Sequence, residues 1–207
     1  MKNKILIFLT LVVLFTATSV FAVTFTDLPE DHWAFEYIAD LTEKEVVNGY
    51  PDGTFNPEGT ISRGEFLKLV IAASMPNDIP IVIMPSALDH WAGQYLHLAI
   101  TYGVVSPNAI TLENIDLPIT RREMAAMITK ADVRMRGVPK NTEKSITFTD
   151  FGKFDASELD LLTHAISQEY LNGYPDGSFG PDNEMTRAEA ATVVYRFTNV
   201  VKEVESK

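Results

Sequence analysis

Apolar side chains recur at the spacing of helical faces in three pairs of segments. The first segments carry Tyr37, Ile38 and Leu41; Tyr95, Leu96 and Ala99; Leu161, Leu162 and Ala165. The second segments meet the spacing i, i+3, i+4, i+7 with Phe66, Leu69, Val70 and Ala73; Met124, Met127, Ile128 and Ala131; Ala190, Val193, Val194 and Phe197. Such stripes are typical of amphipathic helices with one buried face. The pattern predicts an all-α fold built from three helix-loop-helix units.

The loop that joins the two predicted helices is nearly the same in the first and third units. The sequence NGYPDG stands at 48–53 and again at 172–177, whereas the middle unit has Ser106–Asn108 in place of Asn-Gly-Tyr. Gly49 and Gly173 end the first helix, and the Pro-Asp-Gly triplets favour a tight turn. One unit is too small to bury both of its stripes, so we expect the three units to pack as one domain.

The repeat divides most of the chain into three units. We place unit one at 23–75, unit two at 85–132 and unit three at 146–200. The segments between them, 75–86 and 133–145, contain proline and polar residues, as linkers do.

Residues 1–22 have the features of a secretory signal peptide. Lys2 and Lys4 make a basic start, an apolar run follows, and Val20 and Ala22 are the small residues that a signal peptidase prefers. We expect cleavage after Ala22. The alternative is an uncleaved membrane anchor, but the apolar run is short for a span of about 20 residues.

The second helix of each unit begins with the same word: Ser or Thr, then Arg, any residue, and Glu. This spacing predicts a capping box, in which the hydroxyl accepts from an early helix amide and the Glu accepts from the amide of the capping residue. The predicted pairs are Ser62 with Glu65, Thr120 with Glu123, and Thr186 with Glu189.

The capping box does not explain the arginines of the three words, Arg63, Arg121 and Arg187. A cation in the first turn faces the positive end of the helix dipole, which costs about 0.3–1 kcal/mol at a surface site. A bound carboxylate or phosphate would remove this penalty, and a guanidinium binds such groups in a planar, bidentate way. An internal ion pair, with Asp27 or Asp150 as the partner, would also remove it. The residues leave both explanations open.

Composition argues against several classes of function. The formal net charge of −11 disfavours binding to nucleic acid or to anionic lipid. The absence of cysteine excludes disulfides and an acylated-cysteine anchor. No second apolar span follows the first 22 residues, and the chain has no P-loop or nucleophile motif. Four histidines lack metal-ligand spacing: His32, His90, His97 and His164. We therefore expect no enzyme activity, no cofactor and no metal site.

The pattern FTDxxxxHWA…NGYPDGTFxP…ISRGEF resembles the S-layer homology family, and three tandem copies resemble its usual wall-anchoring unit. The resemblance implies a pseudo-threefold bundle with grooves between neighbouring units. It also implies that these grooves bind secondary cell-wall polysaccharide, typically through the pyruvate ketal carboxylate of an N-acetylmannosamine unit. By this resemblance Arg63, Arg121 and Arg187 would hold the carboxylate. The groove walls would be formed by Trp33, Trp91, Gly49, Tyr50, Asp52, Gly173, Tyr174 and Asp176.

Each of these wall residues also has a structural interpretation. Trp33 and Trp91 precede apolar helices and could be core residues, and Asp52 and Asp176 are common turn formers. Two departures from the family pattern limit the number of grooves. Unit two lacks the Gly-Tyr pair of the loop, and unit three has Ser157 where the other units have tryptophan. We expect one or two competent grooves rather than three.

The sequence thus predicts a secreted, non-catalytic module that binds a cell-wall carbohydrate at the bacterial surface without a covalent bond. Its expected partner is an anionic, pyruvylated secondary cell-wall polysaccharide or a peptidoglycan-linked glycan. The alternative is a structural adaptor that assembles with other surface-layer proteins, with partly decayed grooves.

Overall fold

A computed structural model describes residues 25–74, 89–137 and 146–205 of the chain. These residues form the α-helices α1 (Phe35–Glu43), α2 (Arg63–Ser74), α3 (Gly93–Thr101), α4 (Arg121–Met135), α5 (Ala156–Ser167) and α6 (Arg187–Glu205), and a short 3-10 helix η2 (Phe151–Lys153). The part of the chain that is described contains no strand longer than an isolated bridge. The all-α prediction is therefore confirmed. The predicted signal peptide, residues 1–22, lies outside the described residues.

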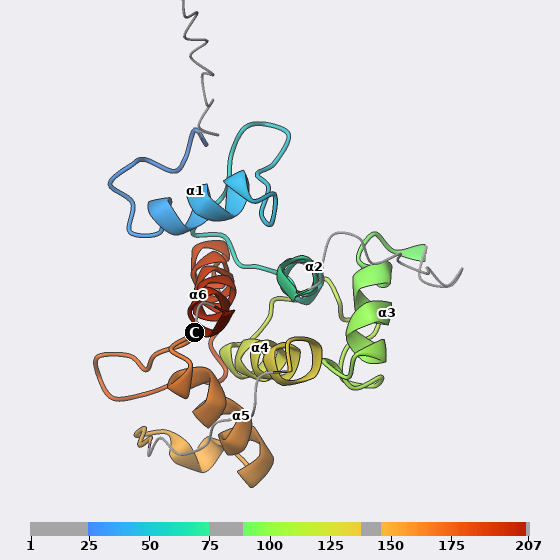
Figure 1. The fold of residues 1–207 in the computed structure, drawn as a ribbon, viewed down its shortest axis with the longest axis vertical. Helices are drawn as coiled ribbons and strands as arrows, with labels where there is room; N and C mark the ends of the chain where they lie inside the picture. Colours follow the sequence, from blue (N-terminus) through green and yellow to red (C-terminus); the bar gives the residue numbers. More distant parts are fainter. Residues whose placement is uncertain (1–24, 75–88, 138–145, 206–207) are drawn as a thin grey trace, which may run out of the picture.

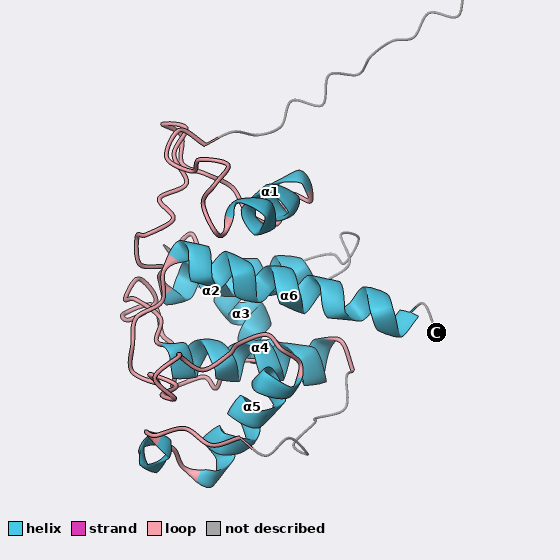
Figure 2. Ribbon diagram, turned by 90° about the vertical axis from the view of Figure 1, so that its left-hand side faces the viewer, coloured by secondary structure: helices cyan, strands magenta, loops and turns pink. Residues whose placement is uncertain are grey.

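The three helices that begin with the Ser/Thr-Arg-x-Glu word form the centre of the bundle. Figure 1 shows α2, α4 and α6 together, with α1, α3 and α5 around them. In Figure 2 the loops gather at the end where α2, α4 and α6 begin. The apolar stripes of these inner helices supply much of the core: Phe66, Val70, Met124, Ile128, Val194 and Phe197 are all fully buried.

Each outer helix packs on an inner helix of a different unit. Helix α1 packs on α6, α3 on α2, and α5 on α4, whereas the two helices of one unit do not pack on each other within the described residues. The apolar stripes of α1, α3 and α5 are thus buried by neighbouring units, through Ile38, Leu96 and Leu162 among others. Each unit therefore depends on its neighbours to cover the apolar stripes of its helices.

A ring of backbone hydrogen bonds joins the three units where the inner helices begin. Ile61 N donates to Met185 O at 3.0 Å, Met185 N to Ile119 O at 3.1 Å, and Ile119 N to Ile61 O at 3.0 Å. All three side chains are buried. The ring brings the three Ser/Thr-Arg-x-Glu words to one place, although each word lies about 60 residues from the next in the sequence.

The three words form reciprocal caps. Thr120 and Glu123 make a complete capping box, with Thr120 N donating to Glu123 Oε2 at 2.9 Å. The equivalent bonds are 2.9 Å from Ser62 N to Glu65 and 2.9 Å from Thr186 N to Glu189.

One boundary of the sequence prediction is wrong. Helix α4 continues through Met135, so the connector that was placed at 133–145 begins later than expected. Asp132, in the last turn of this helix, is fully buried and bonds to His164 and Tyr170 of unit three, at 2.9 and 2.8 Å. Residues 138–145 of this connector and the whole of the other connector, 75–86, lie outside the described residues.

Candidate functional site

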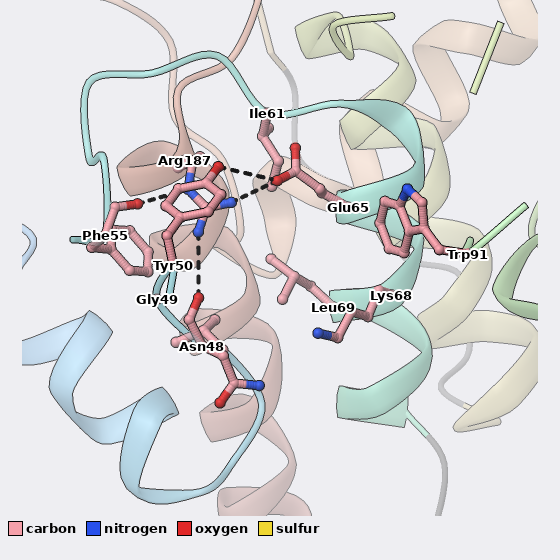
Figure 3. Close-up of a pocket in the computed structure, with 11 residues that line it drawn as sticks. Asn48, Gly49, Tyr50, Phe55, Ile61, Glu65, Lys68, Leu69, Trp91 and Arg187 are labelled. Carbon is pink, nitrogen blue, oxygen red and sulfur yellow. Dashed lines mark hydrogen bonds and ion pairs between the residues drawn. The ribbon is translucent and has the colours of Figure 1, made fainter. Parts of the chain in front are cut away.

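A pocket of about 180 Å³ lies where the three units meet, on the loop side of α2. Unit one supplies its loop and one face of α2, unit two supplies Trp91, and unit three supplies Arg187 (Figure 3). The lining residues are Val47, Asn48, Gly49, Tyr50, Phe55, Ile61, Glu65, Lys68, Leu69, Trp91 and Arg187. Of the residues that the sequence singled out, the fold brings together Gly49, Tyr50, Glu65, Trp91 and Arg187.

Arg187 is held at the back of this pocket by one hydrogen bond from each of its three guanidinium nitrogens. Its Nε donates to Phe55 O at 2.8 Å, Nη1 to Glu65 Oε1 at 2.8 Å and Nη2 to Asn48 O at 3.4 Å. The guanidinium carbon also lies over the rings of Tyr50 and Phe55, 4.6 and 4.8 Å from their centroids. Such cation–π contacts and charge-assisted bonds fix the side chain, and only 8% of the residue is exposed.

Tyr50 and Glu65 complete the polar wall of the pocket. The Tyr50 hydroxyl donates to Glu65 Oε1 at 3.4 Å. Burial raises the pKa of Tyr50, and the neighbouring Glu65 carboxylate raises it further, while Arg187 opposes the change. The phenol therefore stays protonated at neutral pH and remains a hydrogen-bond donor.

Trp91 and Trp33 are surface residues, so the core interpretation of both is wrong. Their exposed fractions are 52% and 56%. Each ring is positioned by the histidine before it. His90 accepts from Ala92 N at 3.1 Å and bonds to Asp116 at 3.0 Å, and its ring centroid lies 5.7 Å from that of Trp91.

His32 plays the same part for Trp33, with bonds of 3.2 Å to Ala34 N and 3.2 Å to Glu58. Sequence reasoning treated these histidines only as possible metal ligands and missed their positioning role. The repeated His-Trp-Ala triplet was the signal that could have revealed it.

Arg63 pairs with the capping glutamate of unit two. Its Nε and Nη2 donate to Glu123 Oε1 at 3.0 and 2.9 Å, and Nη1 donates to Asn114 O at 3.2 Å. The side chains of Arg63 and Glu123 are 15% and 28% exposed. The capping glutamates Glu65 and Glu123 therefore have two roles, because each also holds the arginine of another unit.

Arg121 has a different set of partners. Its Nη2 donates to Asn172 O and its Nη1 lies 3.7 Å from Met185 Sδ. The guanidinium lies over the rings of Tyr174 and Phe179, at 4.7 and 4.8 Å. Within the described residues Nε has no hydrogen-bond partner and no carboxylate forms an ion pair with Arg121. Burial lowers the pKa of Arg121, and Tyr174 and Glu189 only partly oppose this effect.

Neither aspartate proposed as an arginine partner serves as one, so that part of the sequence interpretation is wrong. Asp27 accepts from the backbone N–H groups of Phe55 and Asn56, both at 2.7 Å. Asp150 accepts in the same way from Phe179 and Gly180, at 3.0 and 2.9 Å. Both carboxylates hold the loop of their own unit.

Asp52 and Asp176 stabilise turns outside the pocket lining. Asp52 Oδ1 accepts from Thr54 N at 3.0 Å and from the Thr54 hydroxyl at 2.7 Å. Ser178 donates to Asp176 in the same two ways, at 2.9 and 2.7 Å. These bonds lower the pKa of both aspartates, and the bond from the hydroxyl has the larger effect.

The glycine before each tyrosine is required by packing inside its own unit. A Cβ on Gly49 would lie 2.3 Å from the Phe25 ring and 2.6 Å from Thr54 O, and a Cβ on Gly173 would lie 2.3 Å from the Phe148 ring. Unit two has neither this glycine nor the tyrosine, and its loop is closed by Asn114, which accepts from Thr111 N at 3.0 Å.

The fold is a helical module in which each outer helix packs on an inner helix of another unit, and residues of all three units line one pocket. Sequence comparison identifies the repeat. The S-layer homology domain matches residues 24–67 and 147–191, which correspond to units one and three. The predicted third copy at 85–132 is not part of this match.

Longer proteins of the bacterial surface contain similar sequences. An uncharacterized cell wall amidase of Bacillus anthracis is 35% identical over 191 residues, an S-layer protein of Bacillus thuringiensis subsp. finitimus is 27% identical over 193, and a cellulosome-anchoring protein of Acetivibrio thermocellus is 29% identical over 117. These alignments cover 89%, 88% and 53% of this chain, but only 33%, 23% and 26% of the relatives. The domain match and the relatives support the predicted location at the cell wall or cell surface.

The described residues include no helix that combines the length and the hydropathy needed to cross a bilayer, and no cluster of three or more potential metal ligands.

Proposed function

We propose that this chain is a non-catalytic module that attaches to an anionic secondary cell-wall polysaccharide without a covalent bond. One observation carries the proposal: the pocket at the meeting point of the three units places an exposed indole and a phenol beside charged and hydrogen-bonding groups. Aromatic faces stack on the apolar faces of sugar rings, while nearby donors bind hydroxyl and carboxylate groups. The S-layer homology match at two segments supports this assignment.

We infer that residues 85–132 form a third unit of the same kind. In the ring of backbone bonds, Ile61, Ile119 and Met185 each donate one bond and accept one. The caps of the inner helices, and the packing of each outer helix on an inner helix of another unit, also repeat from unit to unit. A pseudo-threefold bundle accounts for all three observations.

The predicted ligand group is the carboxylate of a pyruvate ketal on the polysaccharide. The acidic chain opposes a long-range attraction to such a polymer, so binding depends on short-range contacts within the Debye length of about 8–10 Å. Where more than one groove is competent, two contacts with one repeating glycan would raise the apparent affinity.

Co-sedimentation with purified wall sacculi tests the proposal, before and after mild acid removal of ketal-linked pyruvate. We expect the protein without residues 1–22 to pellet with intact sacculi and to lose most of this binding after the acid treatment. Trp91→Ala should weaken binding about tenfold, which corresponds to about 1.4 kcal/mol. Leu117→Ala is the matched control, because Leu117 is 53% exposed and does not line the pocket.

Failure of the unmodified protein to bind any sacculi would contradict the proposal. Self-association in gel filtration, together with that failure, would favour the alternative of a structural adaptor among other surface proteins.

A further inference from the structure

The pocket lined by Tyr50 and Trp91, called the Tyr50–Trp91 pocket below, contains charged groups that are not equally available to a ligand. Arg187 uses Nε, Nη1 and Nη2 for protein acceptors, and aromatic rings cover its guanidinium. Glu65 accepts from Arg187 at Oε1 and from Ser62 N at Oε2. Glu65 therefore neutralises the charge of Arg187 inside the pocket, and three of the five guanidinium N–H groups already donate to protein acceptors.

Lys68 supplies the positive charge that remains. It lies one turn after Glu65 on α2, is partly exposed, and lines the same pocket. Figure 3 shows its side chain among the lining residues, on the α2 side. Lys68 takes part in no hydrogen bond or ion pair found among the residues that the structure describes. Its ammonium can therefore turn toward a ligand at little cost in lost contacts.

This lysine distinguishes unit one from the other two units. Five residues after the arginine of the Ser/Thr-Arg-x-Glu word, unit one has Lys68, unit two has Ala126 and unit three has Thr192. Thr192 is buried and its hydroxyl donates to Ala188 O at 3.0 Å, so it offers no charge. The three Ser/Thr-Arg-x-Glu words are similar, but only unit one, which supplies most of the pocket lining, has a cation at this position.

We propose that Lys68 binds the anionic group of the glycan in this pocket, and that Arg187 is a positioning residue which holds Tyr50, Glu65 and the loop of unit one in place. The inference rests on the proposed function, and it names Lys68 rather than Arg187 as the residue that contacts the anionic group directly. A sugar-linked carboxylate and a sugar-linked phosphate share the required chemistry, namely a compact anion that accepts from an ammonium.

Calorimetric titration with solubilised wall polysaccharide tests this assignment, using polysaccharide with its pyruvate, the same material after mild acid treatment, and the same material after phosphatase treatment. Lys68→Met removes the charge and keeps an unbranched apolar stem. We expect it to weaken binding about tenfold and to abolish the preference for pyruvylated over acid-treated material. Lys68→Arg should restore most of the affinity. If the unmodified protein instead binds the phosphatase-treated polysaccharide more weakly and the acid-treated polysaccharide as well as the untreated one, the anion is a phosphate.

Lys153→Met is the matched control, because Lys153 is 57% exposed and lies outside the pocket. Urea unfolding of Lys68→Met should match that of the unmodified protein, which separates a ligand contact from a structural role. If Lys68→Met keeps both the affinity and the preference, the anion is held elsewhere and the inference fails while the proposed function stands. If the unmodified protein binds neither polysaccharide nor sacculi, the proposed function fails, and the inference fails with it.

Discussion

The surroundings of Arg187 and Arg121 are built from equivalent parts but differ in charge pairing. Both guanidinium groups lie over a tyrosine and a phenylalanine and donate to the carbonyl of an asparagine. Arg187 also has Glu65 at 2.8 Å. Arg121, equally buried, faces Met185 Sδ instead and leaves Nε without a partner among the described residues.

The difference shows that a repeated sequence word does not guarantee a repeated electrostatic site. Met185 occupies in unit three the place that Ile61 has in unit one, and its sulfur lies near Arg121. A sulfur atom is a weak acceptor and cannot replace a carboxylate. Desolvation of the Arg121 cation is therefore only partly compensated, which is the cause of its lowered pKa.

The largest expected effect comes from removing the paired arginine. Arg187→Met should lower the free energy of unfolding by about 2–4 kcal/mol, because Glu65 loses its ion-pair partner inside the pocket. Arg121→Met should change it by less than about 1 kcal/mol, because an apolar side chain replaces a buried cation without a carboxylate partner. Urea unfolding followed by circular dichroism measures both values.

A double variant provides the control for this pair. Glu65→Gln should recover part of the loss when it is combined with Arg187→Met, since the carboxylate left unpaired is then neutral. Equal losses for Arg187→Met and Arg121→Met would show that the ion pair contributes nothing to the difference between the two sites.

An intermediate effect is expected at the glycines of the two loops. A Cβ on Gly49 would lie 2.6 Å from the backbone oxygen of Thr54, whereas a Cβ on Gly173 would lie 3.2 Å from that of Ser178. Both would also meet a phenylalanine ring at 2.3 Å. Gly49→Ala should therefore cost about 2–3 kcal/mol and Gly173→Ala about 1–2 kcal/mol.

Thermal unfolding of the two variants measures this difference. Gly152→Ala is the control, because no atom lies within 4 Å of the added Cβ. A melting temperature for Gly173→Ala below that of Gly49→Ala would contradict the packing argument.

The smallest effect is expected at the turn aspartates, and it should be the same in both units. Hydroxyl and backbone bonds lower the pKa of Asp52 and Asp176 in the folded state. The stability they contribute is therefore complete above the ordinary aspartate pKa of 3.8 and is lost as the pH falls through the lowered value.

Asp52→Asn and Asp176→Asn should each be slightly less stable than the unmodified protein at neutral pH, and this gap should close as the pH falls through the lowered aspartate pKa. Urea unfolding across this pH range measures the gap. A gap that is present in one unit alone, or that widens in acid, would contradict equal turn chemistry.

The local features of this fold could be predicted because short-range physics determines them. The stripes of Phe66 and Val70 required a helix with one buried face, and the spacing of Thr120 and Glu123 required a cap at its start. Asp52 and Asp176 were identified as possible turn formers for the same reason, since the N–H groups that donate to their carboxylates lie two residues away. The pairing of helices was not predictable in this way. By its sequence, the apolar face of each outer helix could pack on any inner helix. In the structure it packs on the inner helix of a neighbouring unit.

In the candidate site, too, some features follow from the sequence and others only from the tertiary structure. The sequence by itself determined which residues are unusual: an arginine where the helix dipole disfavours one, and aromatic residues in turns. The tertiary structure alone decided that Arg187 meets Glu65 across 122 residues of chain, that Trp91 stays exposed and borders the loop of unit one, and that Lys68 faces the same pocket. The reason is physical. Caps and turns involve atoms within a few residues, whereas ion pairs and pockets depend on which distant segments the packed core brings together.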